Sequence, residues 1–429
     1  MGVPNRRRWT AAGVMAILLA TAPGAPGVLA AVHAPGAAGK DSAVVSAGAS
    51  AARAATVDIR PVREEAEDNL ETDLAHESRA AVVMDYATGR VLFEKDAHEK
   101  LPMASITKVM TLLLVAEAID GGRLRFSDRV KASEYAASMG GSQIFLEPGE
   151  TMTVEDLIKG IAVASANDAC VALAEHLSGS EENFVRQMNR RAHELGMDDT
   201  HFVNCNGLPE PDHYSSAHDI AIMSRELLKH EWITKYTSVY SDYLRKDTEH
   251  PFWLVNTNKL VRFYPGVDGL KTGYTAEAKY CLSATAKKDG FRVIAVVMGA
   301  PKPSVRNREV SELLNWTFSH YTSKVLYKAG QTVGTVHVLH GVPDTIPVVT
   351  GDTVGVIHKR AEHPQFQTQI QLSELGAPVK PGQVVGELKV LDGEDVVASC
   401  RLLAGQGARR AGLLDTVGRT LRGLVTFGH

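Results

Sequence analysis

Residues 280–299 decide the fold class and read Tyr-Cys-Leu-Ser-Ala-Thr-Ala-Lys-Lys-Asp-Gly-Phe-Arg-Val-Ile-Ala-Val-Val-Met-Gly. Two apolar runs, 280–287 and 291–299, are joined by the turn Lys288-Asp289-Gly290, a pattern typical of two antiparallel strands. The segment 269–272 predicts a further strand before them, and 306–320 predicts a helix after them. This part of the chain therefore predicts a sheet with a helix packed against it.

A second strand signal lies far earlier in the chain. Residues 80–86 and 91–95 are strand-like and are joined by Ala87-Thr88-Gly89-Arg90, which predicts a hairpin. Apolar spacing and capping residues predict the helices between the two groups of strands at 106–119, 153–164, 168–177, 180–196 and 217–229. The simplest assembly is an α+β domain over 78–320, with one antiparallel sheet built from both ends, flanking helices and a helical lobe.

The remaining carboxy-terminal sequence predicts two further parts. Short Val-rich runs alternate with turns over 321–403, which is typical of a small β-sandwich. For 404–429 we expect an amphipathic helix, because Leu413, Leu414, Val417, Leu421 and Leu424 fall on one face. A basic helix of this kind suits a membrane surface, and docking on the β-rich domain or on a partner is the alternative.

The amino-terminal sequence predicts export. Arg6, Arg7 and Arg8 precede the apolar run 11–20, which is shorter than a membrane span requires and is typical of a signal peptide over 1–34. Residues 35–77 predict a flexible linker followed by an acidic segment. We expect an exported, extracytoplasmic protein, peripheral to the cytoplasmic membrane.

Composition narrows the partners and the state of the cysteines. The chain has 429 residues, a net charge of −4 and 44% hydrophobic residues, as in a folded soluble protein without the concentrated basic face of a nucleic-acid-binding domain. Export permits disulfides, but a chain of this size does not need them. We expect buried free thiols at the four cysteines, with one bridge left open.

Three short motifs carry candidate chemistry, in the order Ser105-Ile106-Thr107-Lys108, Ser165-Ala166-Asn167 and Lys271-Thr272-Gly273. Each is common by itself, whereas the ordered set, each in its expected local context, is specific. A serine needs a base to become a nucleophile, and a lysine three residues later on a helix lies on the same face. Such a lysine is a base only when burial or a neighbouring cation lowers its pKa.

These motifs predict one site for acyl transfer. Ser105 is the candidate nucleophile, Lys108 its base, and Ser165 a relay for the proton that reaches the leaving amine. Asn167 is expected to bind the substrate amide and to hold Lys108. Strand 271–273 can pair with an extended peptide, and Lys271 and Thr272 can hold its terminal carboxylate while Gly273 allows close approach.

The chain resembles the D-alanyl-D-alanine carboxypeptidases of the low-molecular-mass penicillin-binding proteins, serine peptidase family S11. The matching stretches are Pro102-Met103-Ala104-Ser105-Ile106-Thr107-Lys108, Gly140-Gly141-Ser142-Gln143, Ser165-Ala166-Asn167-Asp168-Ala169 and Gly266-Val267-Asp268-Gly269-Leu270-Lys271-Thr272-Gly273-Tyr274-Thr275.

The resemblance implies a fold of the serine β-lactamase and penicillin-binding-protein type, peptidoglycan stem peptides as substrates and β-lactams as covalent inhibitors, without metal or cofactor. It places the oxyanion between the backbone N–H groups of Ser105 and Tyr274. Lys279 departs from the glycine that the family often has there.

Other activities remain as alternatives. A DD-endopeptidase or transpeptidase would use the same acyl-enzyme, and a non-catalytic cell-wall sensor would keep the fold alone. A β-lactamase is disfavoured, because its deacylating glutamate would precede Leu314-Asn315 and Ser311 stands in that position.

Residues outside the motifs have plainer interpretations. His213 and His218-Asp219 lie near a helix start rather than at metal-like spacing, and Cys170 lies in an alanine-rich helix. Trp253, with Asn256 and Asn258, either lines a ligand cleft or packs a loop.

Overall fold

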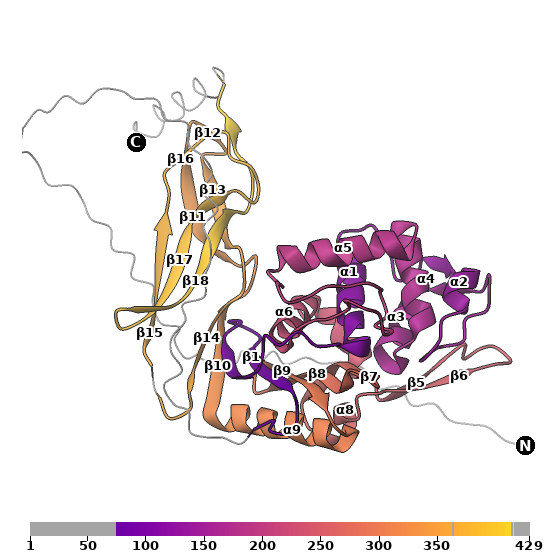
Figure 1. The fold of residues 1–429 in the computed structure, drawn as a ribbon. Helices are drawn as coiled ribbons and strands as arrows, with labels where there is room; N and C mark the ends of the chain where they lie inside the picture. The colour runs from indigo at the N-terminus through magenta and orange to yellow at the C-terminus, as the bar shows by residue number, and fades with distance from the viewer. Residues whose placement is uncertain (1–73, 363, 413–414, 416–429) are drawn as a thin grey trace, which may run out of the picture. The chain divides into compact units, whose positions relative to one another are not determined.

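The computed structural model describes residues 74–362, 364–412 and 415 (Figure 1). The helices in this part of the chain are α1 (Lys108–Asp120), α2 (Glu134–Ala137), α3 (Val154–Lys159), α4 (Asn167–Ser178), α5 (Glu181–Glu194), α6 (Ala217–Leu227), α7 (Thr234–Thr237), α8 (Leu260–Phe263) and α9 (Pro303–His320). Three shorter turns accompany them: the 3-10 turns η1 (Ala104–Thr107) and η3 (Glu231–Ile233) and the π-helical turn η2 (Gly160–Ala164).

The strands of the first domain are β1 (Ala80–Asp85), β2 (Val91–Lys95), β3 (Arg129–Lys131), β4 (Thr151–Thr153), β5 (Ser241–Leu244), β6 (Phe252–Val255), β7 (Val267–Thr275), β8 (Lys279–Lys288) and β9 (Phe291–Ala300). Five of them form an antiparallel sheet in the order β2-β1-β9-β8-β7. The amino-terminal hairpin thus pairs with the late strands through β1 and β9, which confirms the predicted sheet built from both ends.

Helices cover both faces of this sheet because its strands are apolar on both sides. On β1, Ala80, Val82 and Met84 face the core of the helical lobe, which includes α1, α4 and α6. Ala81 and Val83 face the opposite core, which α9 covers (Figure 1). Burial on both faces explains why β1 and β9 are nearly continuous apolar runs rather than alternating ones.

The predicted helix starts are confirmed at three capping residues. The side-chain oxygens of Thr153, Ser180 and Ser216 accept the backbone N–H three residues later, at the starts of α3, α5 and α6. The expected helix at 153–164 is divided, because α3 gives way to η2 before Ser165. The expected helix at 106–119 also begins differently, since η1 precedes α1.

A separate β-rich domain follows α9. Its strands are β10 (Tyr321–Tyr327), β11 (Thr332–Leu339), β12 (Gly341–Val342), β13 (Thr345–Thr350), β14 (Val354–Lys359), β15 (Phe366–Leu372), β16 (Leu375–Gly376), β17 (Val384–Asp392), β18 (Asp395–Ala404) and β19 (Arg409–Arg410). Six form one sheet in the order β15-β17-β18-β13-β11-β16, and β10 pairs with β14. Apolar side chains of these strands form one core, as expected for a small sandwich.

The start predicted for the carboxy-terminal helix, residue 404, is wrong. Ala404 ends β18, and β19 pairs with β12 through Gly341↔Arg410 and Val342↔Arg409. Arg409 and Arg410 therefore belong to a strand, which removes two of the four arginines that the prediction assigned to the helix. The rest of that helix, 413–414 and 416–429, lies outside the described residues.

The amino-terminal predictions also lie mostly outside the described residues. The signal peptide and all of the linker before residue 74 belong there. Residues 74–77 are described and are not helical; Ala75 is fully buried, and the Glu77 N–H donates to Glu309 Oε1 of α9 at 2.8 Å. The end of the predicted linker is therefore packed against the first domain.

The four cysteines are free and buried, as predicted. Burial raises the pKa of the Cys170 thiol to about 12 and the pKa of the Cys281 thiol to about 11. Thiols of this kind are largely protonated at neutral pH and unreactive, so Cys170 is part of the core rather than a nucleophile.

Candidate active site

Ser105 lies in η1, the short turn that leads into α1. Ile106, Thr107 and Lys108 are buried around it, while the Ser105 side chain is half-buried and reachable. The distance from Lys108 Nζ to Ser105 Oγ is 2.9 Å. The structure therefore places the base and nucleophile predicted by their three-residue spacing in direct contact.

Lys108 is held by three acceptors and is shielded from solvent. Its Nζ donates to Ser105 Oγ, to Asn167 Oδ1 at 2.6 Å and to the backbone carbonyl of Asn206. The side chain is fully buried, and this burial lowers its pKa, outweighing neighbouring groups such as Asp168 that raise it. Burial disfavours the charged amine, which is the condition for a lysine to act as a base.

Lys271, on β7, is a second buried amine at the site. Its Nζ donates to the backbone carbonyl of Thr272 at 2.9 Å. Burial, and then the positive charge of Lys108, lowers the pKa of Lys271 well below its ordinary value. Two interacting buried amines are costly to protonate together, so the pair favours one neutral amine. Of the two, Lys108 is the better candidate for the base, because Lys108 contacts Ser105.

Ser165 and Asn167 follow η2 and reach the site in different ways. Ser165 has φ +65 and is almost fully buried. Within the described part of the chain its hydroxyl makes no hydrogen bond, so the expected relay contact with Lys108 is not formed in this structure. Asn167 instead contacts Lys108 directly, as predicted.

Strand β7 forms the edge of the sheet at the site, and Gly273 brings it close to the nucleophile. A Cβ on Gly273 would lie 2.7 Å from the Met103 carbonyl oxygen and 3.2 Å from Ala104 Cβ. Thr272 donates its hydroxyl to Thr257 Oγ1 at 2.8 Å. Tyr274 is exposed and stacks on Tyr280, with ring centroids 4.4 Å apart. Gly273 is therefore required for β7 to pack against the turn that bears Ser105, whereas its predicted close approach to a bound peptide stays a prediction.

The sequence reasoning missed the loop around Asn206 and Gly207. Its backbone carbonyl at Asn206 accepts from Lys108, and Gly207 has φ +86. A Cβ on Gly207 would lie 2.0 Å from the Ala104 carbonyl oxygen, so no other residue fits without movement. The Asn-Gly dipeptide is a turn signal and is the one feature that could have pointed to this loop.

His213 is a second missed contact of the nucleophile turn. Its Nε2 lies 2.7 Å from Thr107 Oγ1, whose hydroxyl lies 2.8 Å from the Ala104 carbonyl. The Val203 N–H donates to His213 Nδ1, so the consistent tautomer donates Nε2–H to Thr107. Burial lowers the pKa of His213 to about 4, which keeps the ring neutral. His213 therefore supports the turn rather than binding a metal.

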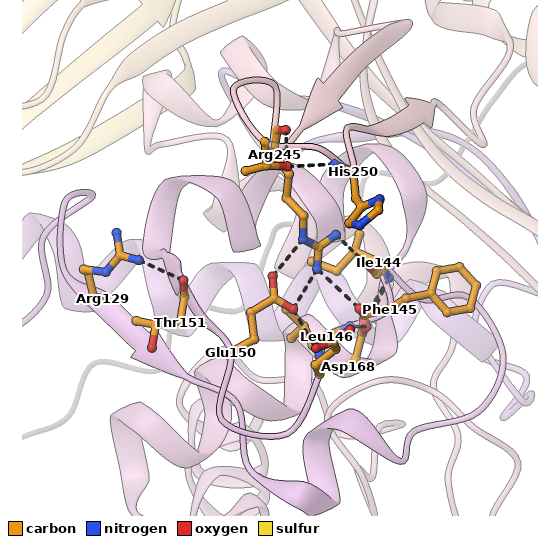
Figure 2. Close-up of polar contacts among 11 residues, drawn as sticks. Arg129, Ile144, Phe145, Leu146, Glu150, Thr151, Asp168, Arg245 and His250 are labelled. Carbon is orange, nitrogen blue, oxygen red and sulfur yellow. Dashed lines mark hydrogen bonds and ion pairs between the residues drawn. The ribbon is translucent and has the colours of Figure 1, made fainter.

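A loop over residues 140–146 lines the other side of Asn167. Asn167 Nδ2 donates to the Gly140 carbonyl at 2.7 Å, and the Asp168 carboxylate accepts the backbone N–H groups of Ile144 and Leu146. Arg245 reaches the same loop from the end of β5, donating to the Ile144 carbonyl at 3.0 Å and to both oxygens of Glu150 (Figure 2). The loop is thus fixed to both the Ser-x-Asn segment and the β5–β6 hairpin.

Lys279, the departure from the family pattern, adopts φ +55. Glycine reaches this left-handed region without strain, which explains the glycine typical of that position. Among the described residues, no group of three or more His, Cys, Asp and Glu side chains is arranged to hold a metal ion.

A reachable serine, a buried lysine of lowered pKa in contact with it and an edge strand beside both define a serine acyl-transfer enzyme. The D-alanyl-D-alanine carboxypeptidase family model, Peptidase S11, matches residues 65–302, and the model of the carboxy-terminal domain of penicillin-binding protein 5 matches 321–409. The chain therefore belongs to the D-alanyl-D-alanine carboxypeptidase family and is a serine-type carboxypeptidase.

Individual relatives and structures agree with this assignment. The chain is 50% identical to the D-alanyl-D-alanine carboxypeptidase DacF of Bacillus subtilis, over 83% of this chain and 92% of that protein. Penicillin-binding protein 5 of Haemophilus influenzae superposes with a TM-score of 0.63 at 30% identity, covering 78% of this chain and 98% of that one. Penicillin-binding protein D2 of Listeria monocytogenes in its ampicillin-bound form covers 58% of this chain and 100% of that one, with a TM-score of 0.52 at 32% identity.

Proposed function

We propose that this chain removes the terminal D-alanine from peptidoglycan stem pentapeptides through an acyl-enzyme on Ser105. The observation that carries the proposal is the 2.9 Å contact between Ser105 Oγ and the buried amine of Lys108. Family membership supplies the substrate class, and the contact supplies the chemical step.

In the acylation step, neutral Lys108 takes the hydroxyl proton of Ser105 as Oγ attacks the carbonyl carbon of the penultimate D-alanine. The bond from Oγ to this carbon forms, and the carbon–nitrogen bond to the terminal D-alanine then breaks. The proton on Lys108 passes to the leaving amine nitrogen. Ser165 is proposed to relay that proton once substrate is bound.

Two backbone N–H groups are proposed to stabilise the tetrahedral oxyanion, those of Ser105 and Tyr274. The close approach of Gly273 to Met103 and Ala104 supports this pairing, since it brings β7 against the turn of Ser105. Asn167 binds the substrate amide while holding Lys108. Thr272 and Lys271, both on β7, are proposed to bind the terminal carboxylate.

Deacylation repeats the chemistry with water as the nucleophile. Lys108 takes a proton from water, the new carbon–oxygen bond forms, and the ester bond to Ser105 Oγ breaks as that oxygen regains its proton. The only Leu-Asn pair of the sequence, Leu314-Asn315, lies on α9, which covers the other face of the sheet, and Ser311 stands where the class A β-lactamase motif has its deacylating glutamate. We therefore expect penicillin to acylate Ser105 and to leave slowly.

We also propose that the chain works outside the cytoplasm at the membrane surface. The signal-like sequence over 1–34 and the apolar spacing of Leu413, Val417 and Leu421 support it. Among the described residues, no helix has the length and apolar character needed to cross a membrane.

The direct test is release of D-alanine from a stem pentapeptide by the purified chain and by its Ser105→Ala variant. The proposal expects release by the wild type and none above background by the variant. Release of a crosslinked dimer into monomers, without pentapeptide trimming, would favour the endopeptidase instead. Equal D-alanine release by the wild type and Ser105→Ala would overturn the assignment of the nucleophile.

A further inference from the structure

The β5–β6 hairpin presents an exposed pair of aromatic side chains beside the active site. Tyr243 and Trp253 are direct cross-strand partners, so their side chains lie on the same face of the hairpin. Their exposed fractions are 46% and 60%, whereas Leu244 and Leu254, at the alternate positions, are buried. Tyr243 and Trp253 are therefore two exposed aromatic side chains on one face of the hairpin that the core does not use.

The segment that follows β6 connects this hairpin to the candidate active site. Directly after β6, the Thr257 N–H donates to the Val163 carbonyl in η2 at 3.2 Å, and Thr257 Oγ1 accepts from Thr272 at 2.8 Å. Asn258 Nδ2 donates to the Gly269 carbonyl on β7 at 3.0 Å. The segment after the aromatic hairpin therefore contacts both η2, which precedes the Ser-x-Asn motif, and β7, which carries the Lys-Thr-Gly motif.

The hairpin is also held firmly. Asn256 Nδ2 donates to the Thr237 and Val239 carbonyls at 2.9 and 2.8 Å. At the other end, Arg245 binds Glu150 and the loop that Asp168 also holds (Figure 2). A surface fixed at both ends loses little conformational freedom when a ligand binds to it.

We propose that Tyr243 and Trp253 form a saccharide subsite, which binds the amino-sugar ring to which the stem peptide is attached. Aromatic rings with a polar edge offer an apolar face and a hydrogen-bonding group together, which suits a pyranose ring with one face of C–H groups and hydroxyls around its rim. The inference rests on the proposed function, because the occupant is the remainder of the same substrate.

The reach of the substrate agrees with this placement. Trp253 precedes Thr257 by four residues, which is about 13 Å in extended chain at ~3.3 Å per residue. With D-alanyl-D-alanine at Ser105, the three preceding residues of the stem extend by about 10 Å at the same rise, and the sugar begins beyond them. The sugar would then arrive at the exposed aromatic pair.

The test compares two substrates, the free pentapeptide and the same pentapeptide on N-acetylmuramic acid, with wild type, Trp253→Leu and Trp253→Phe. The wild type is expected to prefer the sugar-bearing substrate in kcat/KM by about 3- to 10-fold, the effect of one aromatic stacking contact. In Trp253→Leu this preference should vanish through a higher KM for the sugar-bearing substrate, and Trp253→Phe should restore most of it.

Controls separate this inference from the function on which it rests. Phe263, exposed on α8, provides a matched variant, Phe263→Leu, which should keep the preference. Hydrolysis of the free pentapeptide and penicillin labelling should be unchanged in every variant. A wild type without the preference, or a Trp253→Leu variant that keeps it, overturns the saccharide subsite alone. Failure of the wild type to release D-alanine from either substrate would overturn the proposed function itself.

Discussion

The two described domains differ most in what their interiors contain. Among the described residues, every buried polar or charged side chain except Thr350 lies in the catalytic domain, and these include Lys108, Asp168, His213 and Lys271. The interior of the β-rich domain consists instead of aliphatic side chains with Cys400 and this one threonine. Both domains are parts of one chain in the same solvent. We therefore attribute the difference in buried polar side chains to the candidate active site, which lies in the catalytic domain.

Buried polar groups destabilise a fold unless each finds a partner. In the catalytic domain the partners are specific, as with the three acceptors of Lys108 and the carboxylate of Asp168 that holds two backbone N–H groups. The buried polar groups around Lys108 and Asp168 therefore form a hydrogen-bond network that fixes the geometry of the site, and the loss of any partner would destabilise the fold. The described part of the β-rich domain carries no comparable network.

The largest effect on activity is expected from removing the buried amine of Lys108. Lys108→Met keeps the approximate shape of the side chain but removes the base and its contacts with Ser105, Asn167 and the Asn206 carbonyl. Acylation by penicillin should fall by roughly 10²- to 10⁴-fold, the usual contribution of a general base. Stopped-flow labelling with a fluorescent penicillin measures this rate.

The fold should survive this change better than the activity does. Circular dichroism and thermal unfolding of Lys108→Met should show a folded protein with a cooperative transition. A variant that is folded and still acylates at the wild-type rate would show that the buried amine is not the base.

The next effect distinguishes two glycines of similar backbone conformation in the two domains. Gly207, at φ +86, has the Ala104 carbonyl oxygen 2.0 Å from where a Cβ would lie, whereas Gly382, at φ +77, has nothing within 4 Å. Gly207→Ala must displace the turn of Ser105, so D-alanine release should fall more than about tenfold, in addition to a strain of about 1 kcal/mol. Gly382→Ala should show the strain alone.

Both variants are checked by urea unfolding and by D-alanine release. If Gly207→Ala and Gly382→Ala lose the same stability and both keep full activity, the close packing of the Asn206–Gly207 loop against the nucleophile turn does not matter for catalysis.

A smaller effect should appear as a pH dependence of stability. Burial lowers the pKa of His213 from 6.5 to about 4, so the unfolded chain binds a proton at this residue more readily than the folded chain does. Stability is then complete above about pH 6.5 and falls as the pH drops toward 4, by about 3 kcal/mol in total for this group. His213→Gln, which can still donate to Thr107, should lose less stability over that range.

Urea unfolding of the wild type and His213→Gln between pH 7 and pH 4 measures the difference. Parallel curves for the two proteins would mean that His213 is not buried as a neutral ring.

Much of the fold could be predicted because local signals and the final packing agree. The turn at Lys288-Asp289-Gly290 and the caps at Ser180 and Ser216 need only neighbouring residues, and these predictions are confirmed. The pairing of β1 with β9 follows from the rule that apolar strands need partners, although more than 200 residues separate them. Ser105 and Lys108 could be placed together because three residues of helix fix their distance.

The rest of the site could not be predicted because it depends on contacts between distant segments. The Asn206 carbonyl and the His213 ring reach Lys108 and Thr107 through tertiary packing, and a backbone carbonyl leaves no mark in the sequence. For Ser165, the sequence motif predicted a contact between its hydroxyl and Lys108, and this contact is not formed in the structure. Strand β19 was missed because its two arginines fit a polar helix face as well as an exposed edge.

The smallest effect on catalysis is expected at the far end of the chain. Because β18 and β19 extend to Arg410, the tail should be removed after Gly412 rather than before residue 404. Deletion of 413–429 should leave D-alanine release unchanged and abolish binding to anionic lipid vesicles. Continued pelleting of the truncated protein with vesicles would contradict the membrane-anchor proposal.

The central claim is that a buried lysine of lowered pKa activates Ser105, and the pH profile of penicillin acylation tests it most directly. The second-order acylation rate of the wild type should rise with pH through an apparent pKa below 10.5, the ordinary value for lysine, because burial already disfavours the charged form of Lys108. Lys108→Met should show no such rise at any pH at which it stays folded. A wild-type acylation rate that rises only near pH 10.5 would contradict the account. So would an acylation rate of Lys108→Met that rises over the same pH range as that of the wild type.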